Sequence, residues 1–175
     1  MLKVIALGAS SSKNSINQQL AVWVANQIKN AEVEVLSLID FEMPIYSIDK
    51  EINGELPTLA KDFASKIDSA DVIVLSLAEH NGSYTSAFKN SMDWVSRIPN
   101  RKIWGDKKMI VLSTSPGPRG AVSVLEAAIN RFPFDGGTIV GKLSLPSFNT
   151  NFSIEKGIIN AEIKNELKKI IEKLG

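Results

Sequence analysis

Hydroxyl side chains gather in the segment Gly8–Asn17, directly after an apolar run and directly before a helix-like stretch. Backbone N–H groups at a helix N-terminus attract anions, and these side chains could add further donors around a phosphate: Ser10, Ser12, Lys13, Ser15 and Asn17. The simpler alternative is that Ser15 or Asn14 only caps the helix. The segment has neither a GxxxxGK[ST] nor a GxGxxG pattern, which argues against a nucleotide hydrolase and against a Rossmann dehydrogenase.

Two further segments have the composition of binding loops. Glu79–Ser83 leaves an apolar run through the turn-forming pair Asn81-Gly82, and its exposed backbone amides could bond the edge of a flat heterocycle. Ser113–Ala121 contains two prolines and two glycines, a composition that gives a stiff loop and lets a ligand approach the backbone closely. An ordinary polar loop and a plain turn are the respective alternatives.

Apolar runs that read as strands alternate along the chain with stretches of helical periodicity. The predicted strands are Leu2–Leu7, Val33–Leu38, Asp71–Leu77, Lys108–Ser113 and Thr138–Gly141, the last extending toward Leu145. The predicted helices are Ser15–Lys29, Leu56–Ser69, Ser86–Ile98, Val122–Phe132 and Ile154–Leu174. This alternation predicts one α/β domain over residues 1–175, a parallel sheet with helices on both faces.

Ligands of open α/β sheets bind outside the carboxyl ends of the strands, where the strand order reverses. The three polar segments each follow a predicted strand, so all three should meet at that edge. The least regular stretch, Ile39–Glu55, is long for a connection. We expect it to pack over the same edge through its apolar side chains Phe41, Met43, Ile45 and Tyr46.

Composition excludes several classes of site. The chain has no cysteine and one histidine, His80, which rules out disulfides, thiolate chemistry, and zinc sites built from Cys or from two His residues. The net charge of +1 argues against a nucleic-acid surface. No apolar run approaches the ~18 residues of a membrane span, and Val4–Leu7 is too short for a signal sequence. A cytoplasmic protein is therefore expected.

The three segments together resemble motifs of the NADPH-dependent FMN reductase family, which includes quinone, chromate and azo-dye reductases. The first is Ser10-Ser-Ser-Lys-Asn-Ser15-Ile-Asn17. The second is Ala78-Glu-His-Asn81-Gly-Ser83, continuing to Phe88-Lys-Asn90-Ser-Met-Asp93-Trp94. The third is Ser115-Pro-Gly117-Pro-Arg-Gly120-Ala121. The chain departs from the family pattern at four positions. Ser12 replaces Arg, Ala78 replaces Pro, His80 replaces Tyr and Ala121 replaces Gly.

The resemblance implies a flavodoxin-like sandwich with strand order 2-1-3-4-5 and FMN at the sheet edge. It implies that Ser10, Ser15 and Asn17 hold the phosphate, that Glu79–Gly82 line the isoalloxazine ring, and that Ser115 and Gly117 flank its other side. The candidate cofactor-binding residues are Ser10, Ser12, Lys13, Ser15, Ile16, Asn17, Glu79, His80, Asn81, Gly82, Ser115 and Gly117. The resemblance also implies that five residues of the next helix set helix packing and a subunit interface rather than chemistry: Lys89, Asn90, Asp93, Trp94 and Arg97.

The implied function is two-electron hydride transfer from NAD(P)H through FMN to a quinone, azo compound or free flavin, in a ping-pong cycle. The cofactor carries that chemistry, so no side-chain catalyst and no metal are required. His80 is at most a proton donor to the acceptor. The resemblance also implies a homodimer or homotetramer. Two alternatives remain open: a flavodoxin-type electron carrier, against which the near-neutral charge argues, and a binding domain that has lost the flavin.

Overall fold

Five parallel strands form the central sheet of the computed structural model, which describes residues 1–54 and 56–174. The strands are β1 (Leu2–Ala9), β2 (Ala31–Ser37), β3 (Val72–Leu77), β6 (Lys108–Thr114) and β7 (Thr138–Leu145). They lie in the order β2-β1-β3-β6-β7, and every neighbouring pair is parallel. Counted along the chain this is 2-1-3-4-5, so the flavodoxin-like α/β fold is confirmed.

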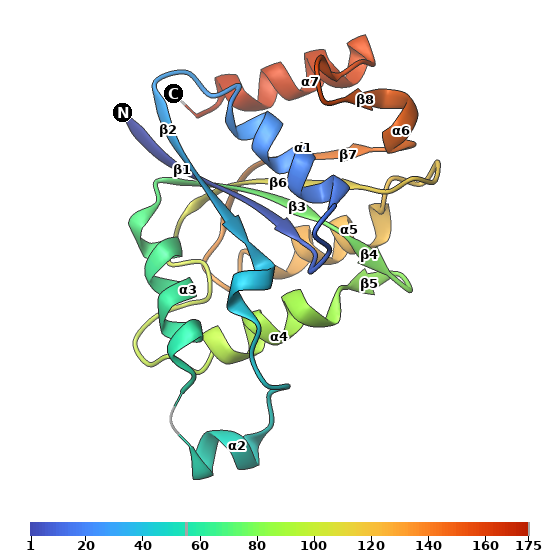
Figure 1. Ribbon diagram of the computed structural model, residues 1–175. Coiled ribbons are helices and arrows are strands. Elements are labelled where there is room, and N and C mark those ends of the chain that lie inside the picture. The colour runs from blue at the N-terminus through green and yellow to red at the C-terminus, as the bar shows by residue number, and fades with distance from the viewer. Residues whose placement is uncertain (55, 175) are drawn as a thin grey trace.

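Helices cover both faces of this sheet (Figure 1). The longer ones are α1 (Ile16–Ala25), α3 (Thr58–Ser69), α4 (Ser86–Val95), α5 (Val122–Arg131) and α7 (Ala161–Glu172). α1 and α7 pack on one face, and α3, α4 and α5 pack on the other. The predicted helices on both faces are therefore present.

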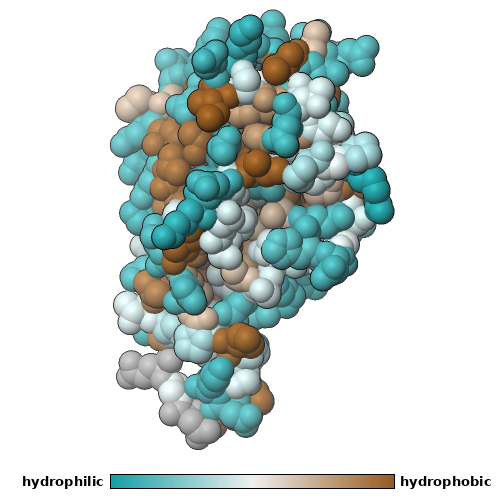
Figure 2. Space-filling view, turned by 45° about the vertical axis from the view of Figure 1, so that its right-hand side comes forward, coloured by the Kyte–Doolittle hydropathy of each residue, from teal (hydrophilic) through white to brown (hydrophobic). Residues whose placement is uncertain are grey.

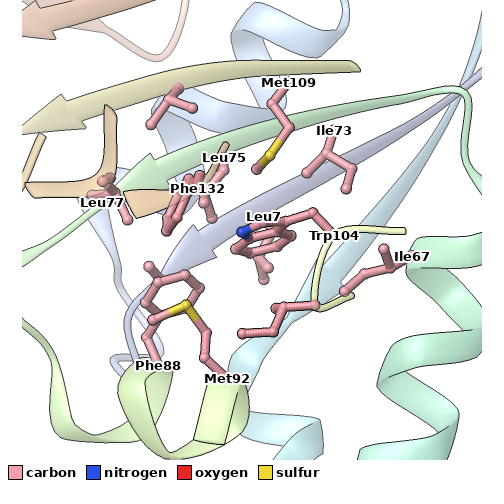
Figure 3. Close-up of a cluster of buried hydrophobic side chains, with 14 of the residues drawn as sticks. Leu7, Ile67, Ile73, Leu75, Leu77, Phe88, Met92, Trp104, Met109 and Phe132 are labelled. Atoms are coloured by element: carbon pink, nitrogen blue, oxygen red, sulfur yellow. The ribbon is translucent and has the colours of Figure 1, made fainter. Parts of the chain in front are cut away.

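Alternation along the buried strands assigns their side chains to two separate cores. Along β1, Ile5 and Leu7 point to the α3–α4–α5 side, whereas Val4 and Ala6 point to the α1–α7 side. Figure 3 shows the first core, in which aromatic and aliphatic side chains from helices and loops meet the strands. Trp104, Phe88 and Phe132 are fully buried there. Both faces of the central strands are covered, which explains their almost wholly apolar sequences.

Several helices are shorter than their apolar periodicity predicts. α1 ends at Ala25 rather than Lys29 because the N–H groups of Gln27 and Ile28 turn to carbonyls three residues back. The chain then reverses at Asn30, which has a φ of 54°. Ile28 is buried although it lies beyond the helix, so its spacing from the other apolar residues arises from burial and not from helical structure. α4 likewise ends at Val95, three residues before the predicted Ile98.

The predicted helix Ile154–Leu174 is wrong in its first third. Short strands β8 (Phe152–Ser153) and β9 (Gly157–Ile158) form a hairpin there, preceded by the short helix α6 (Phe148–Asn151). Helix α7 begins only after Asn160, whose side chain accepts hydrogen bonds from the N–H groups of Glu162 and Ile163. Gly157 lies in the left-handed region, with a φ of 69°, which a continuous helix could not include.

The irregular segment after β2 contains the 3-10 helix η1 (Leu38–Phe41) and α2 (Ile48–Asn53), and the predicted range ends at Glu55, outside the described residues. Phe41 and Met43 are buried, as predicted, but Ile45 is 77 % exposed. α4 holds the segment: the Trp94 Nε1 donates to the Pro44 carbonyl at 2.7 Å. From Met43 onward the segment is held on α4, while η1 also contacts β1 and β2. α2 projects from the body, with hydrophobic and hydrophilic side chains at its surface (Figures 1 and 2).

Each helix that the structure describes is too short or too polar to span a membrane.

Candidate functional site

The three polar segments meet where the strand order reverses. They follow β1, β3 and β6, whose carboxyl ends lie at one edge of the sheet, on the right-hand side of Figure 1. β1 lies between β2 and β3. Helix α1, in the crossover from β1 to β2, covers one face, and α4, in the crossover from β3 to β6, covers the other. A crevice at that point is the usual ligand position in this fold. The sequence therefore placed the three segments correctly at the β1/β3 edge.

The first loop ends in the N-terminus of α1. Ser15 is the N-cap, and its Oγ accepts a hydrogen bond from the Gln18 N–H at 3.1 Å. Capping uses the oxygen as an acceptor, which leaves the hydroxyl proton free to donate to a ligand. The N–H groups of Ile16 and Asn17 belong to the first turn and lack intrahelical acceptors. No acidic side chain lies in that turn.

The hydroxyls before the cap stay near the surface. Ser10 Oγ accepts from the Ser12 N–H at 3.2 Å, and Ser12 and Lys13 are exposed. Within the described residues, no ion pair involves Lys13. The loop therefore presents hydroxyl and ammonium donors together with the positive end of a helix, which suits a phosphate.

Asn17 faces the protein, not the solvent. Its side chain is 3 % exposed; Oδ1 accepts from Ser76 Oγ at 2.7 Å, and Nδ2 donates to the Thr114 carbonyl at 3.3 Å. Asn17 therefore ties α1 to β3 and β6 underneath the first loop. Its side chain serves to place the helix N-terminus, while its backbone N–H lies in the first turn.

The middle loop is a tight hairpin of β4 (Glu79–His80) and β5 (Ser83–Tyr84). Asn81 and Gly82 form the turn with φ values of 52° and 77°, as the Asn-Gly pair predicts. His80, Asn81 and Gly82 are exposed, and a Cβ at Gly82 would meet no atom within 4 Å. The hairpin thus offers its backbone to a ligand, with open space beside the glycine.

Glu79 joins the middle loop to the third. Its Oε2 accepts a hydrogen bond from the Val124 N–H in the first turn of α5, at 3.0 Å. α5 needs such a partner because its own cap residue, Ala121, has no polar side chain. The Glu79 carboxylate is therefore committed to a helix N-terminus, which positions the hairpin against α5.

Backbone carbonyls fix the third loop. The Gly120 carbonyl accepts from Ser113 Oγ at 2.7 Å and from Ser144 Oγ at 2.9 Å, and the Gly117 carbonyl accepts from the Ser147 N–H at 2.9 Å. Gly120 has a φ of 59°, and a Cβ there would lie 2.3 Å from Ser144 Oγ. At Gly117 the nearest atom to a Cβ would be Ser115 Oγ, at 4.0 Å, so this glycine borders open space.

Four residues that hold the loops together were missed at the sequence level: Ser76, Ser113, Ser144 and Thr85. Buried Thr85 caps α4 by accepting from the Phe88 N–H, and it donates to the Ala9 carbonyl at 3.0 Å. The first and middle loops are joined through this residue. A threonine directly before the predicted start of a helix was a visible capping signal. The three serines lie in or beside strands and carried no such signal.

The phenol of Tyr84 belongs to the core beneath the hairpin. Its ring stacks on Phe132, with the ring centroids 6.2 Å apart. Burial, together with the Asp135 carboxylate, raises the pKa of Tyr84 to about 12. The phenol is thus a neutral packing group at physiological pH.

Among the described residues, no cluster of His, Asp or Glu could hold a metal ion.

The arrangement can bind a phosphate at the start of α1 and a flat ring between the hairpin and the third loop. The first turn of α1 has no acidic side chain, and Gly82 and Gly117 border open space. FMN combines a dianionic phosphate with a flat heterocycle, and the residues present fit both parts.

Comparison with known proteins gives the same picture. A model of the family described as NADPH-dependent FMN reductase matches residues 2–150. An Arabidopsis thaliana NADPH:quinone oxidoreductase is 32% identical over 127 residues, which is 70% of this chain and 63% of that protein. The match thus spans less than two thirds of that relative. The quinone reductase of Escherichia coli K12 is 29% identical over 154 residues, 81% of each chain.

Among solved structures, the flavoenzyme NAD(P)H:(acceptor) oxidoreductase FerB from Paracoccus denitrificans superposes with a TM-score of 0.76. The superposition covers 98% of this chain and 94% of that one, at 21% sequence identity. Likeness at this level of identity establishes the shared fold.

Proposed function

This chain belongs to the NADPH-dependent FMN reductase family, and we propose that it is an FMN-dependent NAD(P)H oxidoreductase that reduces a small acceptor by two-electron transfer. One observation carries the proposal. Three polar loops converge at the β1/β3 edge, beside a helix N-terminus whose first turn has no acidic side chain. That combination suits a phosphorylated flat cofactor.

We assign the phosphate of FMN to the first loop and the N-terminus of α1. The donors would be the hydroxyls of Ser10, Ser12 and Ser15, the Lys13 ammonium, and the N–H groups of Ile16 and Asn17. The family usually has Arg where this chain has Ser12, and exposed Lys13 supplies a cation one residue later. The ring would lie between the hairpin, at Glu79–Gly82, and the third loop, at Ser115 and Gly117.

Bound FMN would supply hydride acceptance and donation, while the chain supplies position and electrostatics. The hairpin and third-loop N–H groups would donate to the polar edge of the ring. Thr85, Asn17 and Glu79 keep these donors in place through the bonds described above. His80 is exposed at the hairpin, where it could pass a proton to an acceptor oxygen; solvent can do the same.

The acceptor class follows from the relatives. Two of them are named as quinone reductases, so we propose a quinone or a similar small aromatic acceptor, such as an azo compound or free flavin. We further propose that residues 1–175 act as one domain and assemble as a homodimer or homotetramer. A purely electron-carrying role is less favoured, because the net charge of +1 argues against the strongly acidic surface by which electron carriers dock.

The purified protein tests the proposal directly. We expect it to bind FMN at micromolar concentration or tighter, to show flavin absorption, and to lose that absorption rapidly when NADPH or NADH is added without oxygen. Addition of a benzoquinone should then restore the absorption. A protein that fails to bind FMN would support the flavin-free alternative. FMN binding without bleaching by either nicotinamide would support the electron carrier.

A further inference from the structure

A cavity of about 830 Å³ lies at the opposite end of the sheet from the three loops. It is formed by the N-terminal residues Met1 and Leu2, the end of α1 with the turn that follows it, and α7. β1 runs from Leu2 in this cavity to the first loop, and its eight residues at ~3.3 Å each separate the two places by ~25 Å. The cavity is therefore independent of the proposed flavin site.

Its walls are mainly apolar and well fixed. Leu2, Ile28, Leu167, Ile171 and Leu174 line it, beside the indole of Trp23. The Trp23 ring packs so closely on Gly157 that a Cβ there would fall 1.8 Å from an indole carbon. The ring also meets Phe152 edge-on, with centroids 6.2 Å apart. A rigid apolar wall of this kind is preorganised for an apolar ligand.

Positive charges surround this apolar interior. Lys29 stands on the α1 side, and Lys164 and Lys168 stand one turn apart on α7. Lys164 Nζ lies 5.9 Å from the centroid of the Trp23 ring. In the part of the chain that is described, none of the three lysines takes part in an ion pair, and Glu172 is the one acidic residue of the lining.

We propose that this cavity binds an anionic amphiphile with a single apolar chain, such as an aliphatic carboxylate. The apolar walls would take the chain, and Lys29, Lys164 and Lys168 would meet the carboxylate at the rim. The volume lies within the range of about 300–1,000 Å³ usual for small-molecule sites. A concave site suits one ligand chain, whereas docking on a membrane surface needs an outward-facing apolar helix stripe.

Trp23 provides the readout. It is partly exposed in the cavity wall, while Trp94 and Trp104 are 1% and 0% exposed, so a ligand in the cavity should change mainly Trp23 emission. In the experiment, decanoate is added to the purified protein at concentrations below those at which decanoate forms micelles. Binding is followed by tryptophan fluorescence and by titration calorimetry. We expect saturable binding, with decanol much weaker than decanoate because it lacks the charge.

Charge variants locate the site. Lys164→Gln combined with Lys168→Gln should weaken decanoate binding by about tenfold, as expected for two exposed ion pairs. Lys169→Gln, on the same helix but outside the lining, should leave it unchanged. Trp23→Phe should remove the fluorescence change, while calorimetry should still detect decanoate binding. Equal affinity for decanol, an equal effect of Lys169→Gln, or binding to anionic vesicles without binding of monomeric decanoate would each overturn the proposal. FMN binding enters none of these measurements.

Discussion

Ser15 shows how one side chain can serve both the fold and a ligand. Its oxygen caps α1, and its proton remains available. The sequence presented capping and phosphate binding as alternatives, but the geometry allows both at once. Asn17 shows the opposite case, because its side-chain amide is hydrogen-bonded to Ser76 and to the Thr114 carbonyl. Residue type and spacing located both positions, but only the packing of β3 and β6 reveals where an amide points.

Replacing Ser15 with Asp tests the phosphate loop. Aspartate also caps helices well, so the stability of α1 should change little. Its charge would repel a bound phosphate, and we expect FMN affinity to fall by at least about tenfold, measured by flavin fluorescence quenching. Ser47→Asp is the matched control, since Ser47 caps α2 in the same way, by accepting from the Lys50 N–H, away from the three loops. Equal FMN affinity in both variants would mean that the phosphate binds elsewhere.

Tyr84 predicts a pH dependence of stability. Its pKa is about 12 in the folded protein against an ordinary value of 10.0. Between these values the unfolded chain loses the phenolic proton and the folded chain keeps it, so this contribution to stability is complete below pH 10 and falls as the pH rises toward 12. Tyr84→Phe should therefore flatten the decline of the unfolding free energy over this interval.

The same variant probes an unpaired hydroxyl. Among the described residues, the buried Tyr84 OH has no hydrogen-bond partner. Removing it should leave the melting temperature at pH 7 unchanged or higher, because no bond is lost. Wild type and variant both retain Tyr46, so the difference between their denaturation curves at pH 7 and pH 11 isolates Tyr84. A clearly lower melting temperature at pH 7 would show that the hydroxyl is bonded in solution.

At the scale of elements, periodicity identified every strand of the main sheet and every long helix, and it failed mostly at their ends. Ile28 kept the helical spacing of its neighbours because it is buried, although the helix had already ended. The stretch after Phe152 was wrongly predicted as helix. Two features prevent a helix there, the left-handed backbone of Gly157 and the contact of this glycine with the distant Trp23. Contacts of that kind join residues far apart in sequence, so local patterns do not contain them.

Gly157 gives the element-scale prediction. A Cβ at this position would overlap the Trp23 indole, and the φ of 69° is unfavourable for any other residue. We expect Gly157→Ala to lower the free energy of unfolding by about 2–4 kcal/mol, from strain and overpacking together. Gly82→Ala is the control: its φ is 77°, but its Cβ would meet no atom. It should cost about 1–2 kcal/mol in urea denaturation, the backbone part alone. Similar losses in both variants would show that Trp23 moves aside freely.

At the scale of the whole molecule, the layered sheet and its binding edge were predictable, because alternating strands and helices permit few other arrangements. The position of the segment after β2 could not be predicted in this way. Its apolar side chains were expected over the carboxyl edge, but Asn90 and Trp94 hold its backbone against α4. The result is a projection that carries α2 and leaves three isoleucines exposed: Ile45, Ile48 and Ile52.

These isoleucines lead to a prediction about assembly. Exposed apolar side chains that gather on one projection are a common mark of a protein interface. If the proposed homo-oligomer forms through α2, then Ile52→Lys, at a side chain that is 73% exposed, should leave the fold intact and shift sedimentation toward the monomer. Ile154→Lys is the matched control, because Ile154 is 83% exposed on the β8–β9 hairpin, outside this projection. An oligomer unchanged by Ile52→Lys but dissociated by Ile154→Lys would place the interface beside α7 instead, and a monomeric wild type would exclude either interface.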